Sequence, residues 1–166
     1  MKQLLERYNL TTKVVLLCLL IASPWLIVQV GIFIIAPNNE INEMPLCPEK
    51  SGNCAHLGGG DDYRLNQNYA SFIEIPATQI YQNLLDYIAD NNGKVMVKEA
   101  TDGSYFVHFV EVTSFWNFPD DVIVFIQASD HNSIIEIHSE SRIGWGDIGL
   151  NPERIDLIYS AVSNID

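Results

Sequence analysis

The uncharged run from Val14 to Ile35 constrains this chain more than any other feature. A helix of 22 residues rises about 1.5 Å per residue and extends roughly 33 Å, and the hydrocarbon core of a bilayer is about 30 Å thick. Ser23 and Gln29 are the only clearly polar members of the run, so it has no polar face. Pro24 is tolerated better in a membrane helix than in a soluble one. We therefore predict a transmembrane anchor over residues 14–35.

Two alternatives to the anchor are a cleaved signal peptide and a buried core helix. A signal peptide has an apolar region of about 7–15 residues, followed by a small-x-small cleavage site. Here the run is longer, and Ile34-Ile35-Ala36 lacks the small residue at position −3. A core helix would show a polar face, which this run lacks. Trp25 lies in the middle of the span, which suggests either a contact with another helix or no partner at all.

Charge predicts the orientation of the anchor. The formal net charge of the chain is −12. Residues 1–13 carry +2, so residues 14–166 carry −14. Basic segments stay on the cytoplasmic side of a spanning helix, so residues 1–13 form a cytoplasmic tail and the C-terminal domain lies outside. We expect a bacterial inner membrane protein with a periplasmic domain, or a lumenal domain in a plastid-bearing cell. The acidic charge argues against nucleic acid as a partner.

Cys47 and Cys54 lie close together after the predicted span. Their spacing and an oxidising compartment favour a disulfide, which would stabilise the domain by about 2–3 kcal/mol. The alternative is a metal site with His56 as a third ligand, but a fourth ligand is missing and the spacing fits no zinc knuckle. Cys18 lies inside the span as a small apolar residue. We expect no metal and no cofactor.

Residue patterns divide the chain after the anchor into a stalk with the cysteine loop, residues 36–66, and an α+β domain, residues 67–166. Apolar residues at helical spacing predict helices over 77–89 and from Asn151, a good N-cap, to the C-terminus. Short turns favour antiparallel pairing. We expect a mainly antiparallel sheet of about five strands with two helices on one face, the strands lying at 69–75, 95–100, 105–113, 121–127 and 133–142.

Three motifs stand out in the domain. They are Cys47-Pro48 with Asn53-Cys54, then Phe118-Pro119-Asp120-Asp121-Val122, and finally a glycine-rich element from Ser141 to Ile155. With them the chain resembles the DUF1499 family, a bacterial and plastid domain of unknown function, over about 47–162. The resemblance implies a membrane-associated or extracytoplasmic domain and no particular activity.

Polar residues around the glycine-rich element form the candidate site. The functional interpretation is a polar pocket in which glycines let a ligand approach backbone amides. The structural interpretation is an Arg–Asp network that clamps the loop to the sheet. The candidate ligand-binding residues are Asp120, Asp121, Ser139, Ser141, Arg142, Asp147 and Arg154.

A non-catalytic role is our first functional hypothesis. His138 points to the opposite face of its strand from Ser139 and Ser141, and His108 leaves only a thin chance of a Ser–His pair. We expect the domain to bind a membrane protein partner or a small amphipathic ligand. The alternative is a membrane-anchored hydrolase using Asp120 or Asp121 with Arg142 and Asp147. The aromatic residues that could anchor an interface are Phe115, Trp116, Phe118 and Trp145.

Overall fold

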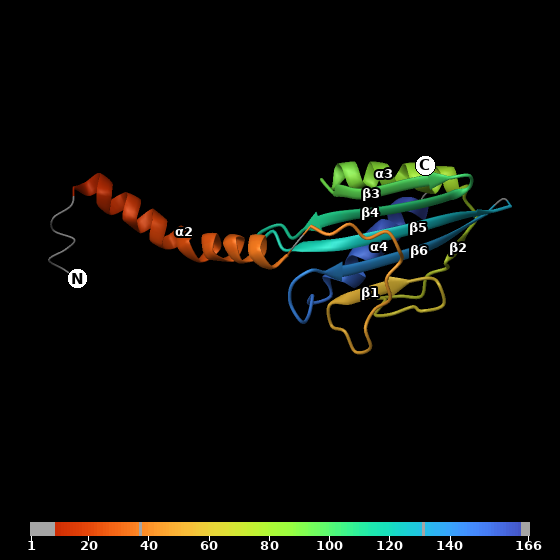
Figure 1. Ribbon diagram of the computed structural model, residues 1–166, viewed down its shortest axis with the longest axis horizontal. Helices are drawn as coiled ribbons and strands as arrows, with labels where there is room; N and C mark the ends of the chain where they lie inside the picture. The colour runs from red at the N-terminus through yellow and green to blue at the C-terminus, as the bar shows by residue number, and fades with distance from the viewer. Residues whose placement is uncertain (1–8, 37, 131, 164–166) are drawn as a thin grey trace.

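The chain forms one long apolar helix followed by an α+β domain (Figure 1). The computed structural model describes residues 9–36, 38–130 and 132–163. The class predicted from the sequence is confirmed. The elements are α2 (Leu10–Ile35), β1 (Cys54–Leu57), β2 (Phe72–Ile73), α3 (Ala77–Asp90), β3 (Lys94–Thr101), β4 (Ser104–Val112), β5 (Pro119–Ser129), β6 (Asn132–Ser141) and α4 (Leu150–Ser163).

The sheet is antiparallel, with strand order β1-β6-β5-β4-β3. Its four longest strands follow one another as a meander, because each connection within it is short. The short strand β2 pairs with the beginning of β6, where Phe72 lies opposite Ile134. The described part of the chain therefore has six strands, one more than the pattern predicts.

The additional strand is β1, which lies inside the segment predicted to be irregular. All four of its residues are buried, and it pairs with β6 so that Cys54 lies opposite Glu140. A strand covered on both faces shows no alternation of apolar and polar residues, so its sequence gives no periodic signal. The strand predicted over 69–75 is reduced to the two residues of β2.

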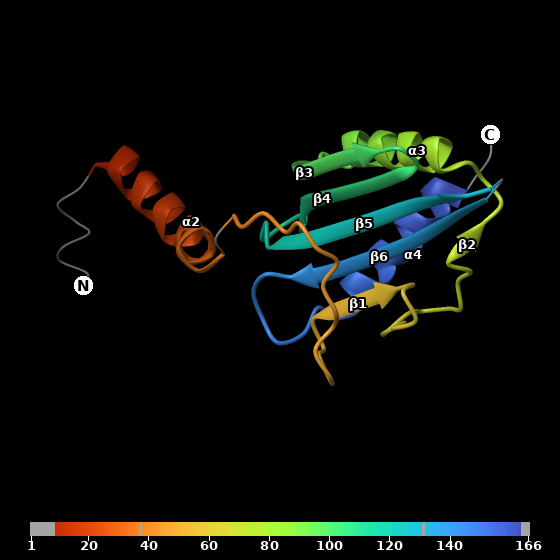
Figure 2. The ribbon, with the colours of Figure 1, turned by 45° about the vertical axis from the view of Figure 1, so that its right-hand side comes forward.

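Helices α3 and α4 pack on one face of the sheet and enclose the core (Figure 2). Both helices present apolar residues at three- and four-residue spacing, as predicted. Alternate residues of β4, β5 and β6 meet them. The core includes Ile80, Leu84 and Ile88 of α3, Ile155, Ile158 and Val162 of α4, and Val107, Phe109, Val122, Val124, Ile126, Ile135 and Ile137 of the sheet.

The segment 38–53 runs across the other face of the sheet (Figure 2). Asn38 Oδ1 accepts a hydrogen bond from Arg142 at 2.8 Å, and the Ile41 N–H donates to His108 Nδ1 at 3.1 Å. This part of the predicted stalk is thus held against the domain by polar contacts that have no sequence periodicity.

Asn9 is the N-cap of helix α2, and its side chain accepts a hydrogen bond from the Thr12 N–H at 2.9 Å. It contains Pro24 and buries none of its residues in the domain. Its 26 residues are long and apolar enough to cross a membrane, a property that a signal sequence shares.

Candidate functional site

The seven predicted site residues do not lie together on one face of the sheet. Asp120 lies opposite Ser141 on β6, but Asp120 and Asp121 are consecutive in β5 and point to opposite faces of the sheet. Asp120 faces the helices, and Asp121 faces the segment 38–53. The structure divides the set among the helix-covered face, the opposite face and the loop between β6 and α4.

Arg154 of α4 organises the network on the helix-covered face. Its guanidinium donates to Asp120 Oδ2 at 2.6 Å and to Glu111 Oε2 at 2.8 Å. It also donates to Ser139 Oγ at 3.1 Å and to Asn151 Oδ1 at 2.9 Å. Burial alone would lower the pKa of Arg154, but the two carboxylates outweigh it and raise that pKa above its ordinary value. This arrangement joins α4 to β4, β5 and β6.

Both predicted serines are engaged by Asn151 rather than by a histidine. Ser139 Oγ donates to Asn151 Oδ1 at 2.6 Å, and Ser141 Oγ accepts from Asn151 Nδ2 at 3.2 Å. His108 and His138 lie on the other face of the sheet, where β4 and β6 turn their alternate residues. Among the described residues, neither serine therefore has an imidazole partner that could activate it.

Arg142 and Asp121 form the network on the opposite face. Arg142 holds Asp121 with two hydrogen bonds, from Nε at 2.8 Å and from Nη2 at 2.6 Å. His108 Nε2 lies 2.7 Å from the same carboxylate. Because the Ile41 N–H occupies His108 Nδ1, the proton of the neutral ring is on Nε2 and is donated to Asp121. Burial raises the pKa of Asp121, but His108 and Arg142 outweigh this effect and hold it below its ordinary value.

Asp147 pairs with Arg64, which the sequence did not single out. Two hydrogen bonds of 2.7 and 3.1 Å join the side chains, and Arg64 also donates to the Cys54 carbonyl at 3.1 Å. Asp147 accepts from the N–H groups of Gly149 and Asn151. It therefore caps the start of α4, the role predicted for Asn151, whose side chain is buried in the Arg154 network.

These placements bear on the predicted hydrolase. Arg142 pairs with Asp121 of β5. Asp120 and Asp147 each bind a different arginine, in different places. Four side chains that were expected to act together thus belong to three separate ion-pair networks.

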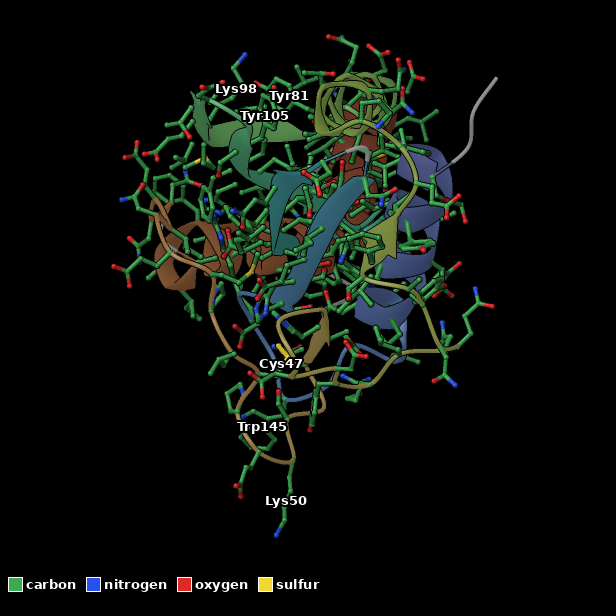
Figure 3. All side chains as sticks on the ribbon, turned by 90° about the vertical axis from the view of Figure 1, so that its right-hand side faces the viewer. Cys47, Lys50, Tyr81, Lys98, Tyr105 and Trp145 are labelled. Atoms are coloured by element: carbon green, nitrogen blue, oxygen red, sulfur yellow. A yellow bond between two sulfur atoms is a disulfide. The ribbon has the colours of Figure 1, made fainter. Side chains whose placement is uncertain are left out.

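The cysteine pair forms a disulfide beside two buried histidines (Figure 3). Cys54 Sγ lies 3.6 Å from His138 Nε2, and His138 Nδ1 lies 3.2 Å from His56 Nδ1. The predicted disulfide between Cys47 and Cys54 is confirmed. Its two sulfurs are bonded to each other, and the imidazole beside them belongs to His138 rather than to His56, the ligand considered in the metal alternative.

Two apolar side chains project from the loop between β6 and α4. Trp145 is 99% exposed and Ile148 is fully exposed. Asp147, which lies between them, is buried, and the loop is bridged to the segment before β1 through Gly52 and Gly146. Figure 3 shows Trp145 at the lower edge of the domain, in the same part of the view as Cys47. The sequence pointed to Trp145 but not to Ile148, because nothing local marks an isoleucine as exposed.

Ile148 also has an unusual backbone conformation. Its φ is +54°, in the left-handed region, which is a genuine outlier for a β-branched residue. The conformation costs about 1–2 kcal/mol, and no packing of the exposed side chain repays it. Asp147 and its hydrogen bonds to Arg64 and Gly149 hold the strained loop in place.

A shallow cavity of about 220 Å³ lies away from all these networks, near the turn between β3 and β4. It contains none of the predicted site residues. Its lining residues are Asn42, Glu99, Thr101, Ser104, Phe106 and Phe125.

Comparison with known proteins agrees with the motif pattern. The family model described as "Protein of unknown function (DUF1499)" matches residues 48–162, from the cysteine loop to the end of α4, and leaves out α2. A search of the curated proteins finds no match. The matched region includes β1 and all three ion-pair networks. The chain therefore belongs to the DUF1499 family.

Proposed function

We propose that this protein is a single-pass membrane protein whose extracytoplasmic domain docks on a partner membrane protein through Trp145 and Ile148. Helix α2 would be the anchor, with the basic tail in the cytoplasm. The disulfide agrees with an oxidising compartment. In this proposal the domain binds a partner and catalyses no reaction.

The observation that carries the docking proposal is the strained and fully exposed Ile148 beside Trp145. Backbone strain persists only where the surrounding structure enforces it, and it gathers at functional sites. Tryptophan is enriched among the residues that contribute most of the binding energy at protein interfaces. A loop already held in its binding conformation also loses little entropy on association.

Charge indicates the kind of partner surface. Residues 14–166 carry a formal charge of −14, so an anionic lipid surface or an acidic protein would be repelled. A complementary surface has an apolar pocket for Trp145 and Ile148 and a basic rim. A neighbouring membrane protein can present such a surface at the height of the domain.

Site-specific photocrosslinking in native membranes tests the proposal. We would place benzoylphenylalanine at Trp145 or, in a separate variant, at Ile148 of the full-length protein. Leu157, an exposed residue of α4, is the matched control position. We expect one protein adduct from position 145, the same adduct from position 148, and none from position 157. Adducts to lipid alone, to a second copy of the chain, or equally from all three positions would contradict the proposal.

The variant Ile148→Gly separates docking from folding. Glycine adopts positive φ freely, so the free energy of unfolding should not fall and should rise by up to about 1 kcal/mol. The adduct from position 145 should be lost if Ile148 is an interface anchor, since such residues contribute at least about 2 kcal/mol, roughly thirtyfold in affinity. An undiminished adduct would show that Ile148 does not bind the partner.

A further inference from the structure

The loop between β4 and β5, residues 113–118, lies against α2 rather than in open solvent. The Trp25 indole Nε1 donates to the Phe115 carbonyl at 3.0 Å, and Gln29 Nε2 donates to the Trp116 carbonyl at 2.8 Å. Asn117 Nδ2 lies 3.4 Å from Gln29 Oε1. Trp25 and Gln29 are four residues apart, so they share one face of the helix. Both are well inside the uncharged run.

These contacts locate the loop along the helix. Gln29 and Trp25 precede Ile35, the last residue of α2, by about 9 and 15 Å of helix rise. The whole helix of 26 residues is about 39 Å long, against a hydrocarbon core of about 30 Å. Even when all the excess length lies on the domain side, Gln29 reaches the hydrocarbon boundary and Trp25 lies about 6 Å below it.

The loop has the composition of a membrane-contacting segment. Residues 112–119 carry no charge. Val112, Phe115 and Trp116 are exposed, and the two aromatic rings pack edge to face with centroids 4.8 Å apart. Tryptophan is enriched where acyl chains meet head groups. A zwitterionic leaflet accommodates this uncharged loop more readily than it would accommodate the acidic remainder of the domain.

The backbone of the loop is also prepared for an apolar environment. Unsatisfied carbonyl and N–H groups cost several kcal/mol each in lipid. Trp25 and Gln29 take up two carbonyls, while Thr113 and Phe118 bond each other through the backbone at 3.0 Å. Phe118 N–H also donates to Thr113 Oγ1 at 3.0 Å. These hydrogen bonds satisfy several of the loop's backbone groups internally, which lowers the cost of entering a bilayer.

We propose that the 113–118 loop inserts Phe115 and Trp116 into the outer leaflet beside α2, so that the domain stands on the membrane at two points. The inference rests on the proposed anchoring of α2, because the helix sets the depth of the loop. A second contact point fixes the tilt and rotation of the domain, which a single helix followed by a connecting segment leaves free.

Fluorescent labelling of the full-length protein in phosphatidylcholine vesicles tests this insertion. The probe is the environment-sensitive dye NBD on Ser114→Cys in a Cys18→Ser background, where the other two cysteines are paired. The matched control is Asp102→Cys, in the β3–β4 turn at the other end of the sheet. We expect blue-shifted emission from position 114, with quenching by lipid-borne nitroxides placed near the head groups. Position 102 should be quenched only by aqueous iodide.

Labelling of the native Cys18 separates this inference from the anchor itself. If NBD on Cys18 is quenched by lipid-borne nitroxides and position 114 is quenched only by iodide, the anchor stands and the loop insertion is wrong. If Cys18 is also accessible to iodide, the proposed anchoring fails. Phe115→Asp should move the label at position 114 into water while the far-ultraviolet circular dichroism of the domain stays unchanged. Unchanged lipid quenching in that variant would likewise overturn the proposal.

Discussion

At the scale of single residues, the direction in which a side chain points decides its chemistry here. Asp120 and Asp121 are neighbours in sequence with the same functional group. One is buried against Arg154, and the other binds Arg142 and His108 on the opposite face. Strand geometry alone produces this separation, since successive side chains alternate between faces.

The buried pair of Arg154 and Asp120 predicts a large loss of stability on truncation. Arg154→Ala leaves the Asp120 and Glu111 carboxylates without their cation, and breaking a buried pair costs about 3–5 kcal/mol. Urea denaturation of the variant measures the loss. Glu153→Ala, at the exposed neighbouring position on α4, should change stability by less than about 0.5 kcal/mol. Equal stability of the two variants would refute a structural role for the Arg154 network.

His56 predicts how stability depends on pH. Burial lowers the pKa of His56, and the nearby His138 lowers it further. The unfolded chain therefore protonates His56 below about pH 6.5, whereas the folded protein binds this proton only at a lower pH. The unfolded state then binds more protons, and the free energy of unfolding falls as the pH drops from 6.5 towards the lower folded pKa. Denaturation at several pH values should show a shallower fall for His56→Gln. Parallel curves would mean that His56 does not carry this dependence.

At the scale of elements, the disulfide connects two parts of the chain that lack strong local preferences. Cys54 is the first residue of β1, an edge strand of four residues. Cys47 belongs to the segment 38–53, which crosses the sheet face opposite the helices. A short edge strand gains little from its own pairing. The covalent link therefore supports both the strand and the loop that contacts it.

Removal of the disulfide should destabilise the domain measurably. For a closed loop of about eight residues, the chain-entropy estimate is about 2.5 kcal/mol. Urea denaturation of Cys47→Ser/Cys54→Ser against the wild type checks it, with Cys18→Ser as a control that should leave stability unchanged. A double variant as stable as the wild type would mean that the noncovalent contacts of β1 hold the strand without the disulfide.

At the scale of the whole molecule, the proposed topology places every described helix and strand except α2 outside the cytoplasm. Protease added to sealed right-side-out vesicles should then digest the domain, whereas inside-out vesicles should protect it. Alkaline carbonate should leave the protein in the membrane pellet if α2 spans the bilayer, and release it if α2 is a cleaved leader. Protection of the domain in right-side-out vesicles would contradict this orientation. It would place the domain in the cytoplasm, which is a reducing compartment.

The sequence by itself determined the apolar helix, the α+β class, the long strands and helices, the family and the disulfide. All of these depend on composition, on periodicity over a few residues, or on a motif. It missed β1, which has no alternation because both its faces are covered, and it treated the segment 38–53 as a stalk.

Only the tertiary structure decided which charges meet. Asp147 binds Arg64 across 83 positions and Asp120 binds Arg154 across 34. The uncharged amide of Asn38 accepts from Arg142 across 104 positions. The strained exposure of Ile148 and the contact of residues 113–118 with α2 were likewise invisible in the sequence. Periodicity is a property of neighbours along the chain, whereas pairing across the fold depends on strand register and helix placement, which short patterns do not encode.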